Sequence, residues 1–186
     1  MFGLFNGSNN DIADDIEAVL RPMAGMAIAK KFALHDIVGD VETWQADLES
    51  AVLLLNETEF RDIQIIGTYA FGDGTWLWAW GNQGSDFAEN IVRDSFALQR
   101  YGKENGIAWL TERTFELEHD DVEAVAAVAV GITQADGYYL AFHDAGIAVF
   151  ALRDTRLQQA LAAENPARAT VVIPEMVATF VLYQQH

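Results

Sequence analysis

Cysteine is absent from this chain of 186 residues, and proline occurs only three times. Without cysteine the chain forms no disulfide and has no thiol nucleophile or thiolate metal site, as is usual for proteins of reducing compartments. Basic residues are also few, since 11 Lys and Arg stand against 28 Asp and Glu, giving a net charge of −17. This balance disfavours double-stranded nucleic acid and anionic membranes as partners, because both attract clustered Lys and Arg.

Long hydrophobic runs are missing as well. The N-terminus has no basic start followed by an apolar stretch, so we expect no secretory signal. The most apolar run, residues 124–132, is much shorter than the ~20 residues of a membrane helix. Hydrophobic residues still make up 51% of the chain, which is enough to build one sizeable core. We therefore expect a folded, cytoplasmic protein that does not bind membranes.

Two patterns of apolar spacing divide the chain. Residues 12–20 show helical spacing, and Pro22 marks the break before a second helix over residues 23–34. From residue 42 onward the spacing changes to two, which is typical of half-buried strands. We therefore predict an N-terminal helical arm, residues 1–40, followed by an α+β domain, residues 41–186.

Within the α+β domain, short turns separate the predicted strands, and this favours antiparallel pairing. We predict strands at residues 44–49, 52–55, 60–71, 75–80, 138–142 and 146–152, and helices at residues 86–101, 122–130 and 154–163. The predicted fold class is α+β, with a curved antiparallel sheet of about six strands and helices packed mainly on one face.

Two further features leave alternatives open. An Ala-Phe pair precedes the turn of two predicted hairpins, at Phe71 and at Phe142, and convergent turn chemistry explains this echo better than a duplicated unit. The apolar residues 171–180 can pack within the chain or against a second copy, so self-association stays open. Pro174 interrupts their pattern, so the conformation of residues 165–186 is left undecided.

Aromatic residues supply the candidate binding residues. On a strand, Trp76, Trp78 and Trp80 point to one face, where they form either a ligand groove or part of the core. We favour the core, because a small sheet needs covering and the available helices are apolar. If the groove exists, its lining consists of the three tryptophans with Tyr69 and one of the pair Tyr138 and Tyr139.

The residue types needed for catalysis and metal binding do not form a recognisable pattern. The serines have no nucleophile elbow, and the glycine-rich turn at residues 72–74 joins two strands, not a strand and a helix. A metal site would have to unite His119 and His143 with Asp121, or with Asp120 or Asp144 in its place, but a helix N-cap and a turn explain these residues better. We therefore predict no metal, no cofactor and no catalytic residues, and we favour a role other than that of an enzyme.

One motif resembles a known family. Residues 74–80 read Gly-Thr-Trp-Leu-Trp-Ala-Trp, which resembles the hallmark strand of a bacterial family of unknown function. Other segments are similar to the same family: residues 44–49, 101–107, 135–139, 144–149 and 173–180. The resemblance covers about residues 42–182 and supports the assignment of a single domain. It implies no activity, and Leu140 stands where the family has a basic residue, so no anion site is implied in that hairpin.

These observations favour a soluble, non-enzymatic binding or interaction module. Strong acidity steers a protein towards basic partners, so a basic protein is the partner class we expect. The alternative is a small-molecule-binding domain, or a weakly marked enzyme, with a pocket lined by the tryptophans and tyrosines named above.

Overall fold

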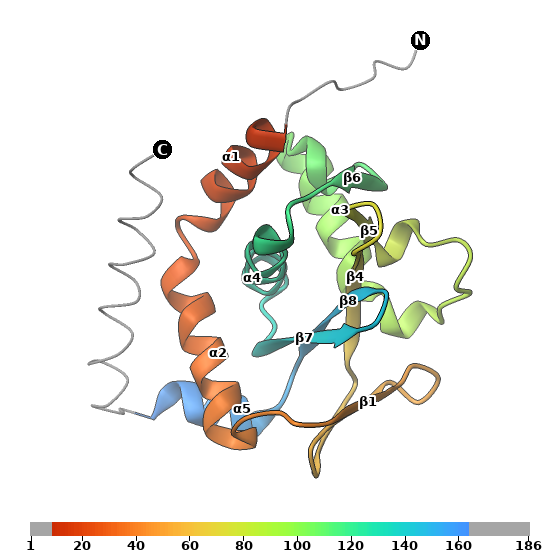
Figure 1. Ribbon diagram of the computed structural model, residues 1–186. Coiled ribbons are helices and arrows are strands. Elements are labelled where there is room, and N and C mark those ends of the chain that lie inside the picture. Colours follow the sequence, from red (N-terminus) through yellow and green to blue (C-terminus); the bar gives the residue numbers. More distant parts are fainter. Residues whose placement is uncertain (1–8, 164–186) are drawn as a thin grey trace.

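The computed structural model describes residues 9–163 and has an α+β fold, as predicted (Figure 1). Its helices are α1 (Asn9–Leu20), α2 (Ala24–Val38), α3 (Arg93–Asn105), α4 (Val122–Thr133) and α5 (Thr155–Ala162). Its strands are β1 (Trp44–Asp47), β2 (Val52–Leu55), β3 (Thr58–Arg61), β4 (Gln64–Ala70), β5 (Thr75–Trp78), β6 (Thr114–Glu116), β7 (Gly137–His143) and β8 (Gly146–Leu152). The open question about residues 165–186 lies outside the described residues.

The prediction of one sheet of about six strands is wrong, because the strands form two antiparallel sheets. One sheet has the order β1-β2-β3, and the other has the order β6-β5-β4-β8-β7. The predicted strand over residues 60–71 is divided at Asp62, whose φ of 54° lies in the left-handed region. A strand cannot continue through that conformation, so β3 joins the smaller sheet and β4 becomes the central strand of the larger one.

The five-stranded sheet separates two hydrophobic cores. On one face, β4, β5, β7 and β8 pack against α4, which is apolar on all sides and buried, with contributions from α1 and α3. On the other face, buried residues of the three-stranded sheet pack with residues of α2 and α5. Helices α1, α3 and α4 therefore cover one face, and the smaller sheet shares the other face with α2 and α5.

The two N-terminal helices share these cores. Ile16 on α1 is only 1% exposed and belongs to the core around α4, while Ala33 and Leu34 on α2 belong to the second core. Lys30 on α2 is buried and donates a hydrogen bond to the carbonyl of Val130, near the C-terminal end of α4 (3.2 Å). A cation is favourable at that end of a helix, where the carbonyl groups concentrate negative charge.

Two predicted element ends are wrong for local reasons. The helix predicted over residues 86–101 begins only at Arg93, after an irregular segment and a short 3₁₀ turn. Gly102 lies inside this helix, where a Cβ would approach the Leu110 Cβ to 2.6 Å, so a glycine is needed for close packing. Gly106, with φ of 69°, is the residue that ends the helix.

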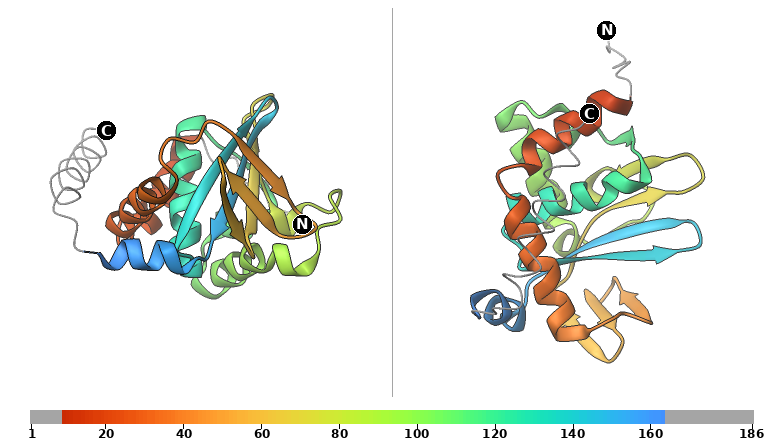
Figure 2. Two further views of the ribbon diagram at one scale, coloured as in Figure 1. Left: turned by 90° about the horizontal axis from the view of Figure 1, so that it is seen from below. Right: turned by 60° about the vertical axis from the view of Figure 1, so that its left-hand side comes forward.

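The β4–β5 and β7–β8 hairpins lie side by side and point in the same direction (Figure 2). The amide of Phe71 donates a hydrogen bond to the carbonyl of Ala145 (3.0 Å), which joins the two turns. Gly146 allows this approach, because a Cβ there would lie 1.9 Å from the carbonyl oxygen of Tyr69. In the part of the chain that the structure describes, no helix has the length and apolar character needed to cross a membrane.

Candidate functional site

The tryptophan strand is part of the core. Trp76 and Trp78 are both 0% exposed, and their rings meet edge to face with centroids 5.3 Å apart. Trp78 also stacks on Trp109, and its indole nitrogen donates to the Trp109 carbonyl (3.1 Å). Trp76 and Trp78 are therefore core residues, as favoured from the sequence, and do not line a ligand groove.

Trp80 does not share a strand face with the other two tryptophans, so that prediction is wrong. Strand β5 ends at Trp78, and Trp80 lies in the short 3₁₀ helix Ala79–Gly81. Its backbone amide donates to the buried hydroxyl of Ser95 (3.1 Å), which in turn donates to the carbonyl of Ile66 (2.9 Å). These side-chain hydrogen bonds replace the ladder hydrogen bonds that a longer strand would make.

Aromatic side chains gather instead at the tips of the two hairpins. Phe71 and Phe142 are 44% and 52% exposed, and the ring of each lies beside the ring of His119, with centroids 5.8 and 6.2 Å from it. Tyr69 is buried beneath them and contacts both Phe71 and His119 at centroid distances of 6.0 and 6.1 Å. We call Phe71, His119 and Phe142 the hairpin-tip patch.

Hydrogen bonds to backbone carbonyls fix the three segments that carry this patch. The hydrogen bond between Phe71 and Ala145 joins the two hairpin turns, and the Trp44 indole donates to the carbonyl of Phe142 (3.0 Å). The segment that leads to His119 is held by the amide of Leu117, which donates to the carbonyl of Gly74 (2.8 Å). Because all three segments are tied to the larger sheet, the patch has a defined shape.

Carboxylates surround the patch. Burial raises the pKa of the Tyr69 phenol, and the negative charges of Glu118 and Asp73 raise it further. Burial likewise raises the pKa of Asp121, with Glu118 and Asp120 adding to the effect. Asp73, Glu118 and Asp120 are therefore near enough to act on these two groups, and they place negative charge beside the patch.

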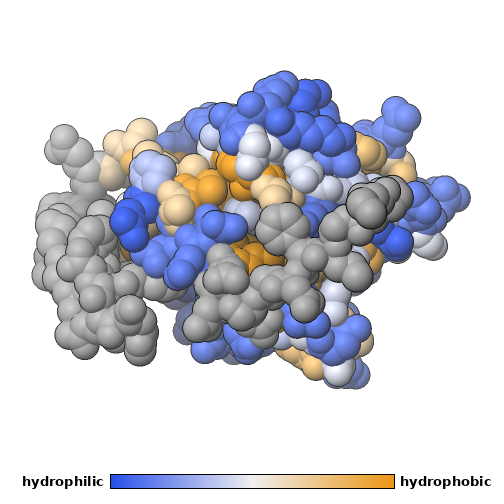
Figure 3. Space-filling model, turned by 90° about the horizontal axis from the view of Figure 1, so that it is seen from above, coloured by the Kyte–Doolittle hydropathy of each residue, from blue (hydrophilic) through white to orange (hydrophobic). Residues whose placement is uncertain are grey.

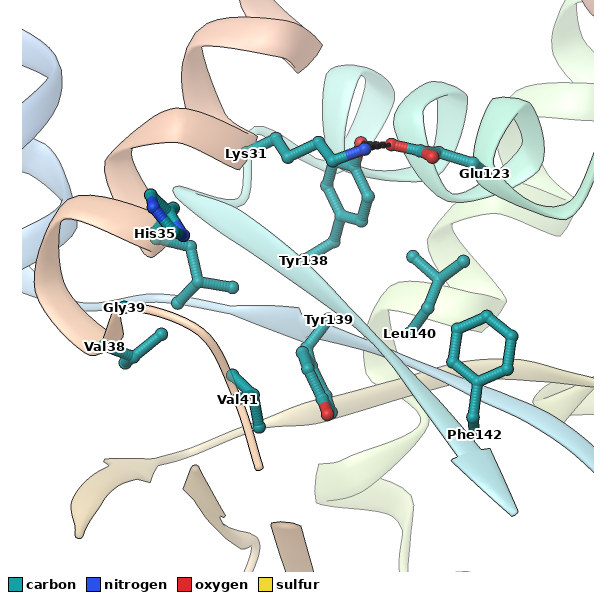
Figure 4. A pocket seen from close by; sticks show the side chains of 11 residues that line it. Lys31, His35, Val38, Gly39, Val41, Glu123, Tyr138, Tyr139, Leu140 and Phe142 are labelled. Atoms are coloured by element: carbon teal, nitrogen blue, oxygen red, sulfur yellow. Dashed lines mark hydrogen bonds and ion pairs between the residues drawn. The ribbon is translucent and has the colours of Figure 1, made fainter. Parts of the chain in front are cut away.

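A second surface feature lies between α2, α4 and β7. Two hollows, of about 270 and 240 Å³, are each lined in part by Lys31, Glu123 and Tyr138. The Glu123 carboxylate accepts hydrogen bonds from the Lys31 ammonium (2.7 Å) and from the Tyr138 hydroxyl (3.0 Å), as Figure 4 shows. Burial, followed by the charge of Glu123, places the pKa of Tyr138 well above its usual value, so this phenol remains a hydrogen-bond donor.

Tyr139 points to the opposite side of β7 from Tyr138 and lines only the larger hollow (Figure 4). The predicted aromatic residues are therefore spread over three places. The tryptophans lie in and beside the core, Tyr69 lies beneath the hairpin-tip patch, and the Tyr138 and Tyr139 pair borders the larger hollow.

The metal candidates His119, Asp121 and His143 have other roles. The Nδ1 atom of His143 accepts a hydrogen bond from the amide of Ala145 (3.3 Å) within its own turn, and His119 packs among aromatic rings. Asp121 belongs to the turn His119–Asp121 that precedes α4. Within residues 9–163, no three His, Asp or Glu side chains gather in a way that suits a metal ion.

Sequence reasoning did not identify Phe71, Phe142, Lys31 or Glu123 as site residues. A signal for the two phenylalanines was present, since each precedes a hairpin turn in the echo described above. The sequence favours turn chemistry over a duplicated unit as the cause of that echo and does not show that the two turns meet. The pairing of β4 with β8 is what brings them together. Lys31 and Glu123 lie 92 residues apart, so spacing along the chain gives no sign of their contact.

Comparison with known proteins gives a family but no activity. No curated protein and no solved structure matches the chain. The model of a family of unknown function, DUF6882, matches residues 17–155, which include most of the N-terminal helical pair as well as both sheets. The resemblance to a family of unknown function is thereby confirmed, and the chain belongs to the DUF6882 family.

Proposed function

We propose that this protein is a non-enzymatic interaction module that binds a basic protein through the hairpin-tip patch. The observation that carries the proposal is the meeting of two half-exposed phenylalanines at one histidine ring. Contiguous exposed apolar groups rimmed by polar ones are typical of protein-binding surfaces, and aromatic side chains are enriched at the centres of such surfaces.

The charge of the rim supports a basic partner. Asp73 and Glu118 act on Tyr69 beneath the patch, Asp120 lies 3.3 Å from the His119 ring, and the whole chain has a net charge of −17. A negative potential around an apolar centre attracts a surface of opposite charge and speeds its association, while the aromatic contacts slow its dissociation. The patch therefore fits a partner that offers Lys or Arg side chains around an apolar depression.

The test is a low-salt pull-down from a lysate of the native host, with three versions of the tagged full-length protein as bait. We expect the wild type to retain one basic protein in stoichiometric amount, and the double variant Phe71→Ala/Phe142→Ala to lose it. Phe96→Ala is the matched control, because Phe96 is 47% exposed on α3 and lies outside the patch. Equal retention by the double variant and the control would contradict the proposal.

The rim makes a separate prediction about rates. Replacing Asp73 and Asp120 by Asn should lower the association rate constant and its dependence on salt, with little change in the dissociation rate. Asp14→Asn/Asp15→Asn, at two exposed positions on α1, is the matched control for the loss of two charges elsewhere. Surface plasmon resonance with the captured partner measures both rate constants.

The alternative, a small-molecule-binding domain, is supported by a different observation. The hollow of about 270 Å³ is close to the lower limit of ~300 Å³ for ligand pockets, and Tyr138 and Tyr139 both line it. A small ligand in this hollow would raise the melting temperature by mass action. A thermal-shift screen with Tyr139→Ala as the matched variant distinguishes this alternative from the interaction module.

A further inference from the structure

Helix α2 is apolar on nearly all sides, although part of it faces solvent. Its sequence, AGMAIAKKFALHDIV, contains only three residues that carry a full charge. Met26 is 55% exposed, while Ile28 and Phe32 are half-buried. A helix with this composition is normally covered on all sides, so some further element is expected to pack against it.

The two hollows follow one flank of this helix from end to end. The smaller hollow lies between α2 and α4 and is lined by Ala24, Ile28, Ala124 and other apolar residues. The larger hollow continues along α2 to Val38 and reaches β7. Seen from the top of Figure 1, apolar residues gather in the middle of the molecule and are bordered by polar ones (Figure 3).

Lys31 and Glu123 lie where the two hollows meet. Both residues line both hollows, and their ion pair spans from α2 to α4 across the boundary. The Lys31 and Glu123 side chains are 61% and 45% exposed, so they remain accessible to another charged group. We call the two hollows together the α2 groove, a mainly apolar channel with this ion pair at its middle and Asp120 in the wall of the smaller hollow.

We propose that the α2 groove binds the apolar C-terminal segment of this same chain, residues 171–180. The segment reads VVIPEMVATF, which contains one charged residue, Glu175, among apolar and small ones. The groove has the matching arrangement, with apolar walls on both sides of Lys31. Burying the segment removes apolar surface from water on both partners, and the Glu175 carboxylate then lies beside the Lys31 ammonium.

The chain is long enough for this arrangement. The last described helix, α5, ends at Ala162 and packs against α2. Residues 163–170 span up to ~26 Å when extended, whereas a helix is ~10–12 Å across and α2 is ~22 Å long. The tether also gives the segment an effective concentration in the millimolar range, which favours it over a second copy of the chain.

Paramagnetic relaxation in the full-length protein tests this proposal. Because the chain has no cysteine, Ala178→Cys provides a single site for a nitroxide spin label. We expect the label to broaden the amide signals of Ala24, Ile28 and Ala124 in the α2 groove, while the signal of Phe96 on α3 keeps its intensity. Gln184→Cys, outside the apolar segment, is the matched labelling control.

Three outcomes are distinguishable. Broadening within one molecule supports the proposal. Broadening that persists when labelled protein without ¹⁵N is mixed with unlabelled ¹⁵N protein shows that a second copy occupies the groove, and it overturns the proposal. If the amide signals have the same intensity with the oxidised and with the reduced label, residues 171–180 of neither the same chain nor a second copy lie in the α2 groove. That result also overturns the proposal and leaves the groove to a small ligand or another protein.

A charge exchange tests the predicted pairing of Lys31 with Glu175. Lys31→Glu should lower the equilibrium constant for occupation of the groove about two- to fivefold, which is the scale of an exposed ion pair. Adding Glu175→Lys should restore it, whereas Asp36→Lys in the same background should not. This inference does not depend on the proposed function. Phe142 belongs to the patch and also lines the larger hollow, whereas Phe71 lines neither hollow, so Phe71→Ala changes the patch and leaves the α2 groove intact.

Discussion

Arg153 joins three elements of the fold, and its removal gives the sharpest stability prediction. Its guanidinium lies 2.5 Å from the carboxylate of Asp94 on α3 and donates a hydrogen bond to the carbonyl of Thr133 at the end of α4 (2.9 Å). The Asp94 side chain is only 6% exposed. Arg153→Met would therefore leave a buried carboxylate without its cation, and such a loss typically costs ~3–5 kcal/mol.

The expected size follows from the burial of Asp94, so a matched exposed pair serves as the control. Arg61 pairs with Glu59 at the surface, where the two side chains are 71% and 46% exposed. Arg61→Met should cost less than ~1 kcal/mol. For a chain of this length, ~3–5 kcal/mol corresponds to a fall of ~6–20 °C in melting temperature, against a few degrees at most for the control.

Urea unfolding followed by circular dichroism measures the free energies. The double variant Arg153→Met/Asp94→Asn should cost less than the sum of the two single variants, because it leaves no unpaired charge. The reasoning is refuted if Arg153→Met is within ~0.5 kcal/mol of the Arg61→Met control, or if the two single changes are strictly additive.

Two further predictions concern packing and capping. Gly67→Ala should destabilise the fold by at least ~2 kcal/mol, because a Cβ there would lie 2.5 Å from the Trp76 ring and 2.7 Å from a backbone carbonyl. Gly72 has open space around it, so Gly72→Ala is the control and should have little effect on the melting temperature in the same thermal melts. Asp154→Ala should cost ~1 kcal/mol at pH 7, because this carboxylate caps α5 by accepting a hydrogen bond from the Arg156 amide (2.8 Å). Hydrogen bonds from Arg156 hold the pKa of Asp154 below its usual value, so its stabilising effect is present above ~pH 4 and disappears as the pH falls through the lower, folded-state pKa. Urea titrations at several pH values should show the difference between wild type and Asp154→Ala shrinking in that acidic range, and a constant difference would contradict the assignment of the cap.

The elements that depend on local pattern were predictable from the sequence. The strands over residues 52–55 and 146–152 have the predicted bounds, since turns on both sides limit them. Strand β1 shows the predicted alternation of half-buried and exposed side chains. The all-apolar helix α4 is buried, as its composition predicts.

The partition into two sheets was not predictable in the same way. It depends on the backbone conformation of Asp62, which has a positive φ. Asp adopts positive φ more readily than most residues, but the pattern of apolar residues does not show at which Asp this happens. The early end of β5 has a similar origin, because the Trp80 amide donates its hydrogen bond to the hydroxyl of Ser95 and not to a neighbouring strand. Both features arise from single residues that act against a regular apolar alternation.

The hairpin-tip patch depends on contacts between distant parts of the chain. Trp44 and Phe142 are 98 residues apart, yet their hydrogen bond fixes one side of the patch. From the sequence, the tryptophans and tyrosines were the candidate lining of a ligand groove, with the core favoured for the tryptophans, and the exposed phenylalanines were not among the candidates. In the fold, size favours burial of Trp76 and Trp78 in the core, and phenylalanines placed at turns remain exposed.

The central claim is that the hairpin-tip patch binds a basic protein, and one affinity measurement tests it most directly. The dissociation constant of the captured partner is measured at low and moderate salt for the wild type, for Phe71→Ala/Phe142→Ala and for Phe96→Ala. The account predicts that the double variant binds at least ~30-fold more weakly, as expected for loss of ~2 kcal/mol at an interface centre. It also predicts that the wild type and Phe96→Ala bind equally well and that both lose affinity as the salt concentration rises. Unchanged affinity in the double variant, or binding that does not respond to salt, would contradict it.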